Sequence, residues 1–282
     1  MTMNLLAFYW HTDPVLLHIG DYGLRWYSLM YASVFLAGWL MFTWFCRRET
    51  VSKDIRLPLL ITLIVSVLVG LRLGQCIFYN PRHYFGSWQG VLDIFKIWKG
   101  GLASHGAVIG VMLGMWWFSS RFGKRFGVDF LWLMDRIVIV AAFAGVLVRT
   151  GNFFNSEIYG PATDLPWGVV FENRGQVVPR HPTQLYEAMA YLLIGLILLW
   201  LYRFKLDKLH RGVFMGLFGV LCFGARFLLE YVKTVKVFVN LGFTTLTMGQ
   251  ALSIPLIITG ICLIAYAGIR KTPAKAGAVK IS

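Results

Sequence analysis

Long apolar runs recur along this chain, and they limit its fold more than any other feature. A helix needs about 20 mostly apolar residues to cross the hydrocarbon core of a bilayer. The sequence supplies such runs near residues 24–45, 59–79, 103–120, 130–149, 184–202, 213–232 and 248–269. Because backbone polar groups in a bilayer must be paired within the protein, each run predicts a helix. We therefore expect an all-α polytopic membrane protein with seven transmembrane helices.

Composition agrees with a membrane location and leaves little room for a soluble domain. The 282 residues are 57% hydrophobic and only 14% charged, so a single integral membrane domain is expected over residues 1–282. The net charge of +14 lies in short basic clusters between the apolar runs, which argues against nucleic-acid binding. The four cysteines lack metal-ligand spacing, so we expect no metal site and no disulfide framework: Cys46, Cys76, Cys222 and Cys262.

Lysine and arginine are divided unevenly between the two sets of loops. One set holds 15 of these residues and the opposite set holds eight. Since cytoplasmic loops retain basic residues, this bias places the N-terminus outside and the C-terminus in the cytoplasm. The long connections 80–102 and 150–183 then form a periplasmic loop region. The N-terminus lacks a basic segment and a cleavage site, so no signal peptide is expected to be removed.

Glycine spacing predicts where helices approach one another closely. Small residues four positions apart let helix backbones come into contact in lipid. The sequence has three such series, one of three glycines and two of two: Gly106, Gly110 and Gly114, then Gly70 and Gly74, then Gly212 and Gly216. Close packing is a sufficient explanation for all of them.

Four arginines fall inside the predicted spans, at Arg72, Arg136, Arg149 and Arg226. A guanidinium at the centre of a bilayer costs at least about 2.5–3.5 kcal/mol, so each needs an ionic partner or an anionic ligand. Arg136 follows an aspartate near the cytoplasmic end, and we expect it to extend to water and to be structural. The other three are candidates for binding a phosphate, which suits their planar donors.

Further polar residues stand beside these arginines. Arg226 and Glu230 are four residues apart on one predicted helix face, where they could neutralise each other or form part of a site. His105 follows two glycines at the start of the third run and could be a base or an interfacial packing residue. The segment from Arg149 to Gly160 contains a cation, two amides and a carboxylate in close succession.

Six segments, in order along the chain, resemble signatures of the prolipoprotein diacylglyceryl transferase family. They are Arg25 to Tyr31, the glycine-rich stretch ending at His105-Gly106, Arg149 to Gly160, His181 to Glu187, Arg226 to Glu230 and Met248 to Pro255. The chain departs from the family pattern in three places. Ala107 stands where a second glycine is usual, the common aromatic near Gln75 and near Cys222 is missing, and no acidic or proline-containing turn follows Glu230.

The resemblance implies a seven-helix enzyme of the bacterial inner membrane. It would transfer the diacylglyceryl group of phosphatidylglycerol to the lipobox cysteine of a preprolipoprotein, giving a thioether and glycerol phosphate, with no cofactor. The implied catalytic residues are Tyr27, His105, Arg149, Arg226 and Glu230. The implied substrate-binding residues are Arg72, Arg149, Asn152, Glu157, Gly160, Gln184, Tyr186 and Glu187.

Two mechanisms and two rival functions remain open from the sequence. In one mechanism His105 takes the thiol proton, Arg149 and Arg226 bind the departing phosphate, and Glu157 and Glu230 orient those arginines. In the other, the arginines lower the pKa of the substrate thiol and His105 positions the lipid. An anionic-solute transporter would show related halves, which the sequence lacks. Another lipid-phosphate transferase, such as one using a polyprenyl donor, would commonly carry an acidic metal-binding motif, which is also missing.

Overall fold

The computed structural model describes residues 8–20, 22–96, 103–234, 238–240 and 245–276, and it is mostly helical. Each of the seven apolar runs is a helix, as the sequence predicted. The chain divides into two compact units. The first unit comprises residues 1–41 and 135–274, and the second comprises residues 42–134 and 275–282.

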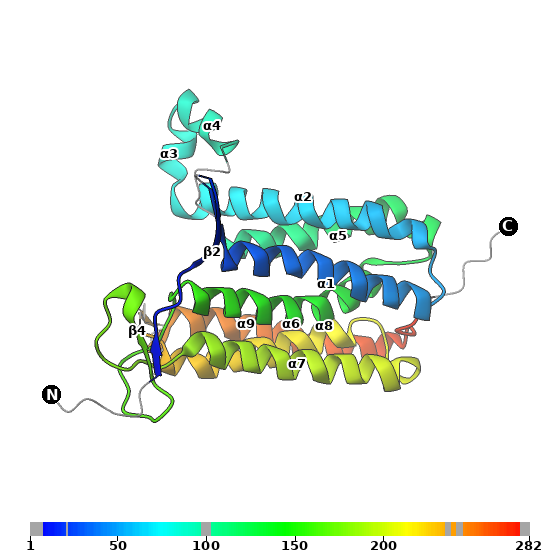
Figure 1. The fold of residues 1–282 in the computed structure, drawn as a ribbon. Helices are drawn as coiled ribbons and strands as arrows, with labels where there is room; N and C mark the ends of the chain where they lie inside the picture. Colours follow the sequence, from blue (N-terminus) through cyan, green and yellow to red (C-terminus); the bar gives the residue numbers. More distant parts are fainter. Residues whose placement is uncertain (1–7, 21, 97–102, 235–237, 241–244, 277–282) are drawn as a thin grey trace. The chain divides into compact units, whose positions relative to one another are not determined.

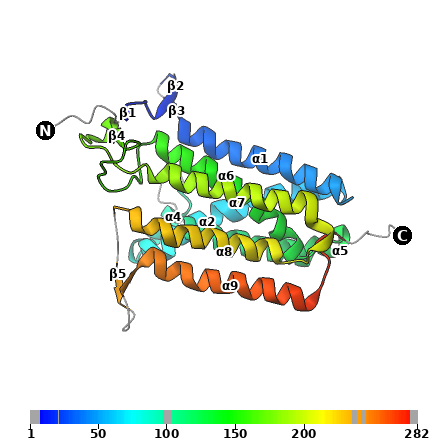
Figure 2. The ribbon, with the colours of Figure 1, turned by 90° about the horizontal axis from the view of Figure 1, so that it is seen from below.

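Five long helices contribute to the first unit. They are the first part of α1 (Trp26–Arg48), most of α6 (Phe130–Phe154), α7 (Thr183–Lys205), α8 (Val213–Leu229) and α9 (Met248–Arg270). Helix α8 packs between α7 and α9, as Figure 2 shows. Short 3-10 turns extend α7 and α8 at their C-terminal ends: η5 (Leu206–Lys208) and η6 (Glu230–Val232).

Short strands of the first unit form three separate pairs among the described residues. Strand β1 (Phe8–Trp10) pairs in parallel with β4 (Val169–Phe171), which precedes η4 (Glu172–Arg174). Strands β2 (Val15–Ile19; labelled in Figure 1) and β3 (Tyr22–Arg25) pair antiparallel, as do β5 (Phe238–Asn240) and β6 (Thr245–Thr247). A small apolar core of Phe153, Val169 and Phe171 joins β4 to the end of α6, with Trp10, Tyr159 and Leu185 packed against it. This core fixes the connection over the N-terminal end of α7.

The second unit is built on a close pair of helices, α2 (Arg56–Gly74) and α5 (Ser104–Phe126). Helix α2 follows η1 (Lys53–Ile55) and continues into the π turn η2 (Gln75–Tyr79), which leads to α3 (Pro81–Phe85) and α4 (Trp88–Ile94). The glycine prediction is confirmed here. A Cβ on Gly70 or Gly74 would collide with the backbone of Gly106, and a Cβ on Gly110 or Gly114 would collide with Ser66.

Six helical segments of the described chain are long and apolar enough to cross a membrane. They are Trp26–Arg48, Lys53–Tyr79, Phe130–Phe154, Thr183–Lys208, Val213–Val232 and Met248–Arg270. This supports the predicted multi-pass membrane protein. Helix α5 is as long as the others but is not one of the six, because glycines, serines and the basic residues Arg121, Lys124 and Arg125 lower its hydropathy.

Two charged residues of α6 tie helix ends together inside the first unit. Asp135 accepts hydrogen bonds from the backbone N–H groups of Gly212 (2.8 Å) and Met215 (3.0 Å), and thereby caps the start of α8. Arg136 donates to the carbonyl of Ala274 at 2.7 Å and lies over the ring of Tyr202. Arg136 is therefore structural, as expected, but the expected extension to water is wrong because its side chain is fully buried.

The four cysteines are all free in this structure. Cys46, Cys76 and Cys222 are buried, whereas Cys262 is exposed on α9. Within the described ranges, no three histidine, cysteine or acidic side chains gather as metal ligands would.

Candidate active site

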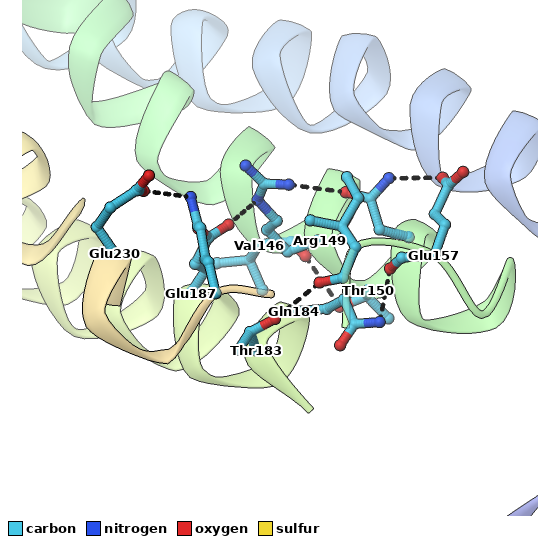
Figure 3. Close-up of polar contacts among 11 residues, drawn as sticks. Val146, Arg149, Thr150, Glu157, Thr183, Gln184, Glu187 and Glu230 are labelled. Atoms are coloured by element: carbon cyan, nitrogen blue, oxygen red, sulfur yellow. Dashed lines mark hydrogen bonds and ion pairs between the residues drawn. The ribbon is translucent and has the colours of Figure 1, made fainter. Parts of the chain in front are cut away.

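Arg149, in the last part of α6, is oriented from two sides. Its Nε forms an ion pair with a carboxylate oxygen of Glu187 on α7, and its Nη1 donates to Oδ1 of Asn152 at 3.1 Å. Glu187 is almost completely buried, and Arg149 is only 18% exposed. None of the contacts among the described residues involves Nη2 of Arg149, and Figure 3 shows this nitrogen without a dashed contact. The guanidinium is thus fixed in place with donors still available for a ligand.

Glu157 is linked to Arg149 through an amide. The Asn152 side chain donates from Nδ2 to Oε1 of Glu157 at 2.8 Å, and Asn155 donates to the same oxygen at 3.3 Å. The sequence-based mechanism had Glu157 orient an arginine, and the structure links the two through Asn152. The carboxylate in direct contact with Arg149 is instead Glu187, and Glu157 fixes the orientation of Asn152.

The turn that carries Glu157 has a strained backbone. Ser156 (φ 52°) and Ile158 (φ 60°), on either side of Glu157, both lie in the left-handed region, which is unfavourable for a β-branched residue. The start of α7 holds this turn. Gln184 Nε2 donates to the carbonyl of Glu157 at 2.6 Å, and Thr183 Oγ1 donates to that of Ile158 at 2.7 Å. A strained backbone that is held in place by surrounding hydrogen bonds is typical of turns at functional sites.

Several polar atoms near this turn are buried without a hydrogen bond. They are Oδ1 of Asn155, Oγ of Ser156 and Oε1 of Gln184, none of which has a partner in the part of the chain that the structure describes. Buried polar atoms are normally paired with protein, water or a ligand. The turn therefore offers acceptors to a molecule that brings hydroxyl groups or water.

Lys233 connects two buried carboxylates from different helices. Its Nζ lies 3.1 Å from Oε1 of Glu187 and 3.2 Å from Oε2 of Glu230. The contacts of Glu187 are ion pairs without the alignment of hydrogen bonds, because neither of its oxygens has a hydrogen-bond partner. A chain of alternating charges results, Arg149–Glu187–Lys233–Glu230 (Figure 3).

Arg226 does not pair with Glu230, although the two are four residues apart. None of the ion pairs within the described ranges involves Arg226, which is half-buried. Glu230 is the C-terminal cap of α8, where its backbone N–H still bonds to the carbonyl of Arg226, and it also begins a 3-10 turn, in which residues three apart are aligned. Glu230 therefore faces Lys233. Arg226 lies on α8, which packs against α7, the helix that carries Glu187 and Tyr191.

Two glycines of the site leave no room for a side chain. A Cβ on Gly160 would lie 2.6 Å from the carbonyl oxygen of Val232 and 2.8 Å from Cβ of His181. A Cβ on Gly249, at the start of α9, would lie 2.5 to 2.6 Å from the carboxylate atoms of Glu230. Gly160 thus supports the segment that ends in Lys233, and Gly249 lets Glu230 rest on α9.

Three aromatic residues border the site. Tyr27, near the start of α1, packs against Gly151, and the charges of Glu157 and Arg149 act on its hydroxyl. Tyr186 accepts a hydrogen bond from Trp167 Nε1 at 2.8 Å, and its hydroxyl lies 3.1 Å from Nδ1 of His181. Most of the predicted site residues therefore gather at one place in the first unit.

Comparison with known proteins identifies the family. The family model described as prolipoprotein diacylglyceryl transferase matches residues 14–266. The chain belongs to the prolipoprotein diacylglyceryl transferase family. Its relatives include the phosphatidylglycerol–prolipoprotein diacylglyceryl transferases of Tolumonas auensis (41% identical, covering 90% of this chain and 95% of the relative) and Pseudomonas aeruginosa (38%, covering 90% and 93%). That of Cupriavidus pinatubonensis is 37% identical, covering 90% and 91%.

Two residues assigned through the family motifs lie in the second unit. His105 is exposed in the first turn of α5. Arg72 is buried at the end of α2, where its guanidinium donates to the carbonyls of Ile94 (2.7 Å) and Asp93. These contacts give Arg72 a structural task in addition to the predicted substrate contact.

Three residues of this candidate site were missed by sequence reasoning. Lys233 was counted only as a loop lysine, although its position three residues after Glu230 is a usable signal. Tyr191 follows Glu187 by one helical turn on α7. Gly249 lies in a segment that resembles a family signature, but its contact with Glu230 could be found only from the three-dimensional structure.

Proposed function

We propose that this chain transfers the diacylglyceryl group of phosphatidylglycerol to the lipobox cysteine of preprolipoproteins. The cysteine sulfur forms a bond to the glyceryl carbon, and the bond from that carbon to the phosphate oxygen breaks. The products are a thioether and glycerol phosphate, and the thiol proton passes to a base. The observation that carries the proposal is Arg149, fixed by Glu187 and Asn152 with donors left open, in a chain of this family.

Arg149 and Arg226 bind the phosphate of the lipid. A leaving phosphate gains charge as its bond to carbon breaks, and preorganised cationic donors stabilise that charge. Arg149 is preorganised by its two protein contacts, and Arg226 is available because Glu230 pairs with Lys233 instead. Glu187 and Glu230 keep the site close to neutral before the anionic lipid binds.

The headgroup glycerol lies against the Glu157 turn. Its hydroxyl groups can donate to buried acceptors of Asn155 and Gln184, which lack partners among the described residues. Asn152 and Tyr27 contribute further polar contacts, and Tyr186 lines the same region. Gly160 has the supporting task of keeping the turn close to Val232.

His105 accepts the thiol proton, and Arg72 assists lipid binding. The assignment of His105 is supported by the glycine-rich motif in which it stands, and that of Arg72 by the position of this arginine in a predicted span. His105 follows the glycine-rich stretch and is exposed, so a substrate can reach it. Because the imidazole and the arginines act on different atoms, substitutions at His105 and Arg149 should affect different steps.

We also propose that residues 1–282 form one domain of the bacterial inner membrane with seven spanning helices, α5 being the seventh. The basic-residue bias supports a periplasmic N-terminus and a cytoplasmic C-terminus. Glu172, in η4, is then periplasmic. Glu172→Cys in a cysteine-free background should react with an impermeant thiol reagent from the periplasm. Labelling from the cytoplasmic side alone would show that the orientation is the opposite one.

The activity is tested with purified protein, phosphatidylglycerol vesicles and a lipobox peptide. Mass spectrometry should detect a diacylglyceryl thioether on the peptide cysteine. A peptide with serine in place of that cysteine is the matched substrate control and should stay unmodified. Unmodified cysteine peptide in the presence of folded protein would refute the proposal.

A further inference from the structure

A short helical hairpin follows the α2 span in the second unit. It comprises α3 and α4, within residues 80–95, and Figure 1 shows it beyond the end of α2. Its turn is tight, because a Cβ on Gly90 would collide with the backbone carbonyl of His83. Ser87 caps α4 by accepting a hydrogen bond from the N–H of Gly90 at 3.1 Å.

The inner side of the hairpin is attached to α2. The buried Arg72 donates to the carbonyls of Asp93 and Ile94 at the end of α4. Its guanidinium also lies 5.1 Å from the ring centre of Tyr84, which is buried on α3. A cation that satisfies the last carbonyls of a helix stabilises its C-terminal end. The hairpin is therefore held in a fixed position at the end of α2.

The opposite side of α4 presents an apolar stripe. Trp88, Leu92 and Phe95 stand at i, i+4 and i+7, and they are 76%, 42% and 74% exposed. Residues at this spacing share one face of a helix. Phe85 of α3 is exposed as well. Large side chains exposed in a continuous row normally contact another molecule or a membrane.

The position of the hairpin directly after a membrane span indicates what this stripe contacts. The span Lys53–Tyr79 ends one residue before the hairpin, and its last residues, Ile77, Phe78 and Tyr79, are exposed apolar side chains. The hairpin thus begins where the span leaves the hydrocarbon. Tryptophan and other aromatic side chains are concentrated at this depth, and short amphipathic helices lie there with the apolar face in the lipid.

We propose that the α3–α4 hairpin lies in the membrane interface and inserts the stripe of Trp88, Leu92 and Phe95 among the lipids. Arg82 and His83, both exposed on α3, are placed to face the headgroups. The occupant is lipid, because the hairpin follows directly on the exposed apolar residues that end the membrane span. The proposal depends on the membrane span and is independent of the proposed reaction.

The test measures the depth of spin labels in the full-length protein. Trp88→Cys, Leu92→Cys and Phe95→Cys are made singly in a background without the native cysteines, labelled, and placed in nanodiscs of phosphatidylethanolamine and phosphatidylglycerol. Lys53→Cys, an exposed position before α2, is the aqueous reference. Gln89→Cys, exposed on α4 but outside the stripe, is the matched control on the same helix.

The measured quantity is the collision rate of the spin label with oxygen divided by its collision rate with a water-soluble nickel chelate. We expect this ratio to be several-fold higher at the three stripe positions than at Lys53→Cys, with Gln89→Cys intermediate. Stripe labels that match Lys53→Cys would overturn the proposal. Labels protected from the chelate only after a lipobox signal peptide is added would also overturn it and assign the stripe to peptide binding. Size-exclusion profiles that match the parent show that the variants are folded.

Discussion

Nζ of Lys233 lies 3.1 Å from Oε1 of Glu187, and this ion pair joins the turn after α8 to the start of α7. Lys233 also reaches Glu230 at 3.2 Å, while Glu187 holds Arg149. One lysine therefore keeps two carboxylates in place. Because Glu230 pairs with Lys233, it does not neutralise Arg226, which we propose as a ligand of the phosphate.

Lys233→Met should weaken both folding and transfer. Removing one member of a buried ion pair costs about 3–5 kcal/mol because the remaining charge stays buried. Glu230 would be free to turn towards Arg226, and we expect transfer to fall by about 10- to 100-fold. The measurements are the thermal midpoint in detergent and the rate of thioether formation. Lys233→Arg retains the charge and should keep most of the stability and most of the rate of transfer. Parental rates in Lys233→Met would exclude this lysine from the site.

Arg226→Lys should preserve folding and abolish most of the transfer. A lysine retains the charge but loses the planar pair of donors that a phosphate accepts. The loss in a dry site is about 2–4 kcal/mol, or roughly 30- to 1000-fold in rate. The rate and the thermal midpoint are measured on the same preparation. A rate near that of the parent would leave Arg149 as the principal phosphate ligand.

The structure changes the meaning of a double substitution at Arg226 and Glu230. If the two residues formed an isolated pair, replacing both by leucine would restore stability. Because Glu230 pairs with Lys233, the double variant should leave Lys233 with Glu187 alone. We expect its thermal midpoint to stay below that of Arg226→Leu. An equal or higher midpoint would mean that Arg226 and Glu230 neutralise each other in solution.

His105→Gln distinguishes the two mechanisms. If His105 takes the thiol proton, the variant should lose about 10²- to 10⁴-fold in kcat near pH 7. The deficit should shrink as the pH rises towards 9, since a free cysteine thiol with a pKa of about 8.5 then ionises without a base. If His105 positions the lipid, the loss should appear in KM for phosphatidylglycerol and stay constant with pH.

Local sequence was sufficient for part of the site and for much of the fold. Each apolar run predicted one of the seven long helices of the described chain, six of which are long and apolar enough to cross a membrane. The spacing of Gly70, Gly74 and Gly106 predicted close helix packing but not which helices meet. Arg149, Asn152 and Glu157 could be placed together because they are close in the sequence. Arg149 donates a hydrogen bond to Asn152, and Asn152 donates one to Glu157, so each bond joins residues that are close in the sequence.

Contacts that depend on a helix end or on a second helix could not be predicted. The spacing of Arg226 and Glu230 allowed an ion pair, but the Glu230 carboxylate contacts Lys233, which follows the end of α8. The partner of Arg149 comes from α7, 38 positions further along the chain at Glu187. Such a contact depends on packing between helices, for which one sequence contains little information.

Ile158→Gly tests the strained turn beside Glu157. A left-handed backbone costs a residue with a side chain about 1–2 kcal/mol, whereas glycine adopts it freely. Glycine also loses more entropy on folding, by about 0.5–1 kcal/mol. We therefore expect unchanged or slightly higher stability. Val177→Gly is the control, because Val177 is exposed with an ordinary negative φ and should lose stability. Equal losses in both variants would show that Ile158 carries no strain.

Gly249→Ala tests whether the position of the Glu230 carboxylate matters for the reaction. The added Cβ would lie 2.5 to 2.6 Å from the carboxylate atoms, so Glu230 must move, and its contact with Lys233 must lengthen. Alanine favours a helix over glycine by about 1 kcal/mol, so the start of α9 should not be weakened. Gly268→Ala is the matched control, because it makes the same change on α9 where no atom lies within 4 Å.

We expect Gly249→Ala to lower the rate of thioether formation by about tenfold or more while its thermal midpoint stays within a few degrees of the parent. Gly268→Ala should keep the parental rate. A change confined to stability would indicate that Gly249 serves only the packing of α9. Because the two substitutions have the same intrinsic effect on the helix, a lower rate in Gly249→Ala alone can come only from the displaced carboxylate. Parental transfer in both variants would show that the reaction does not depend on where Glu230 is held.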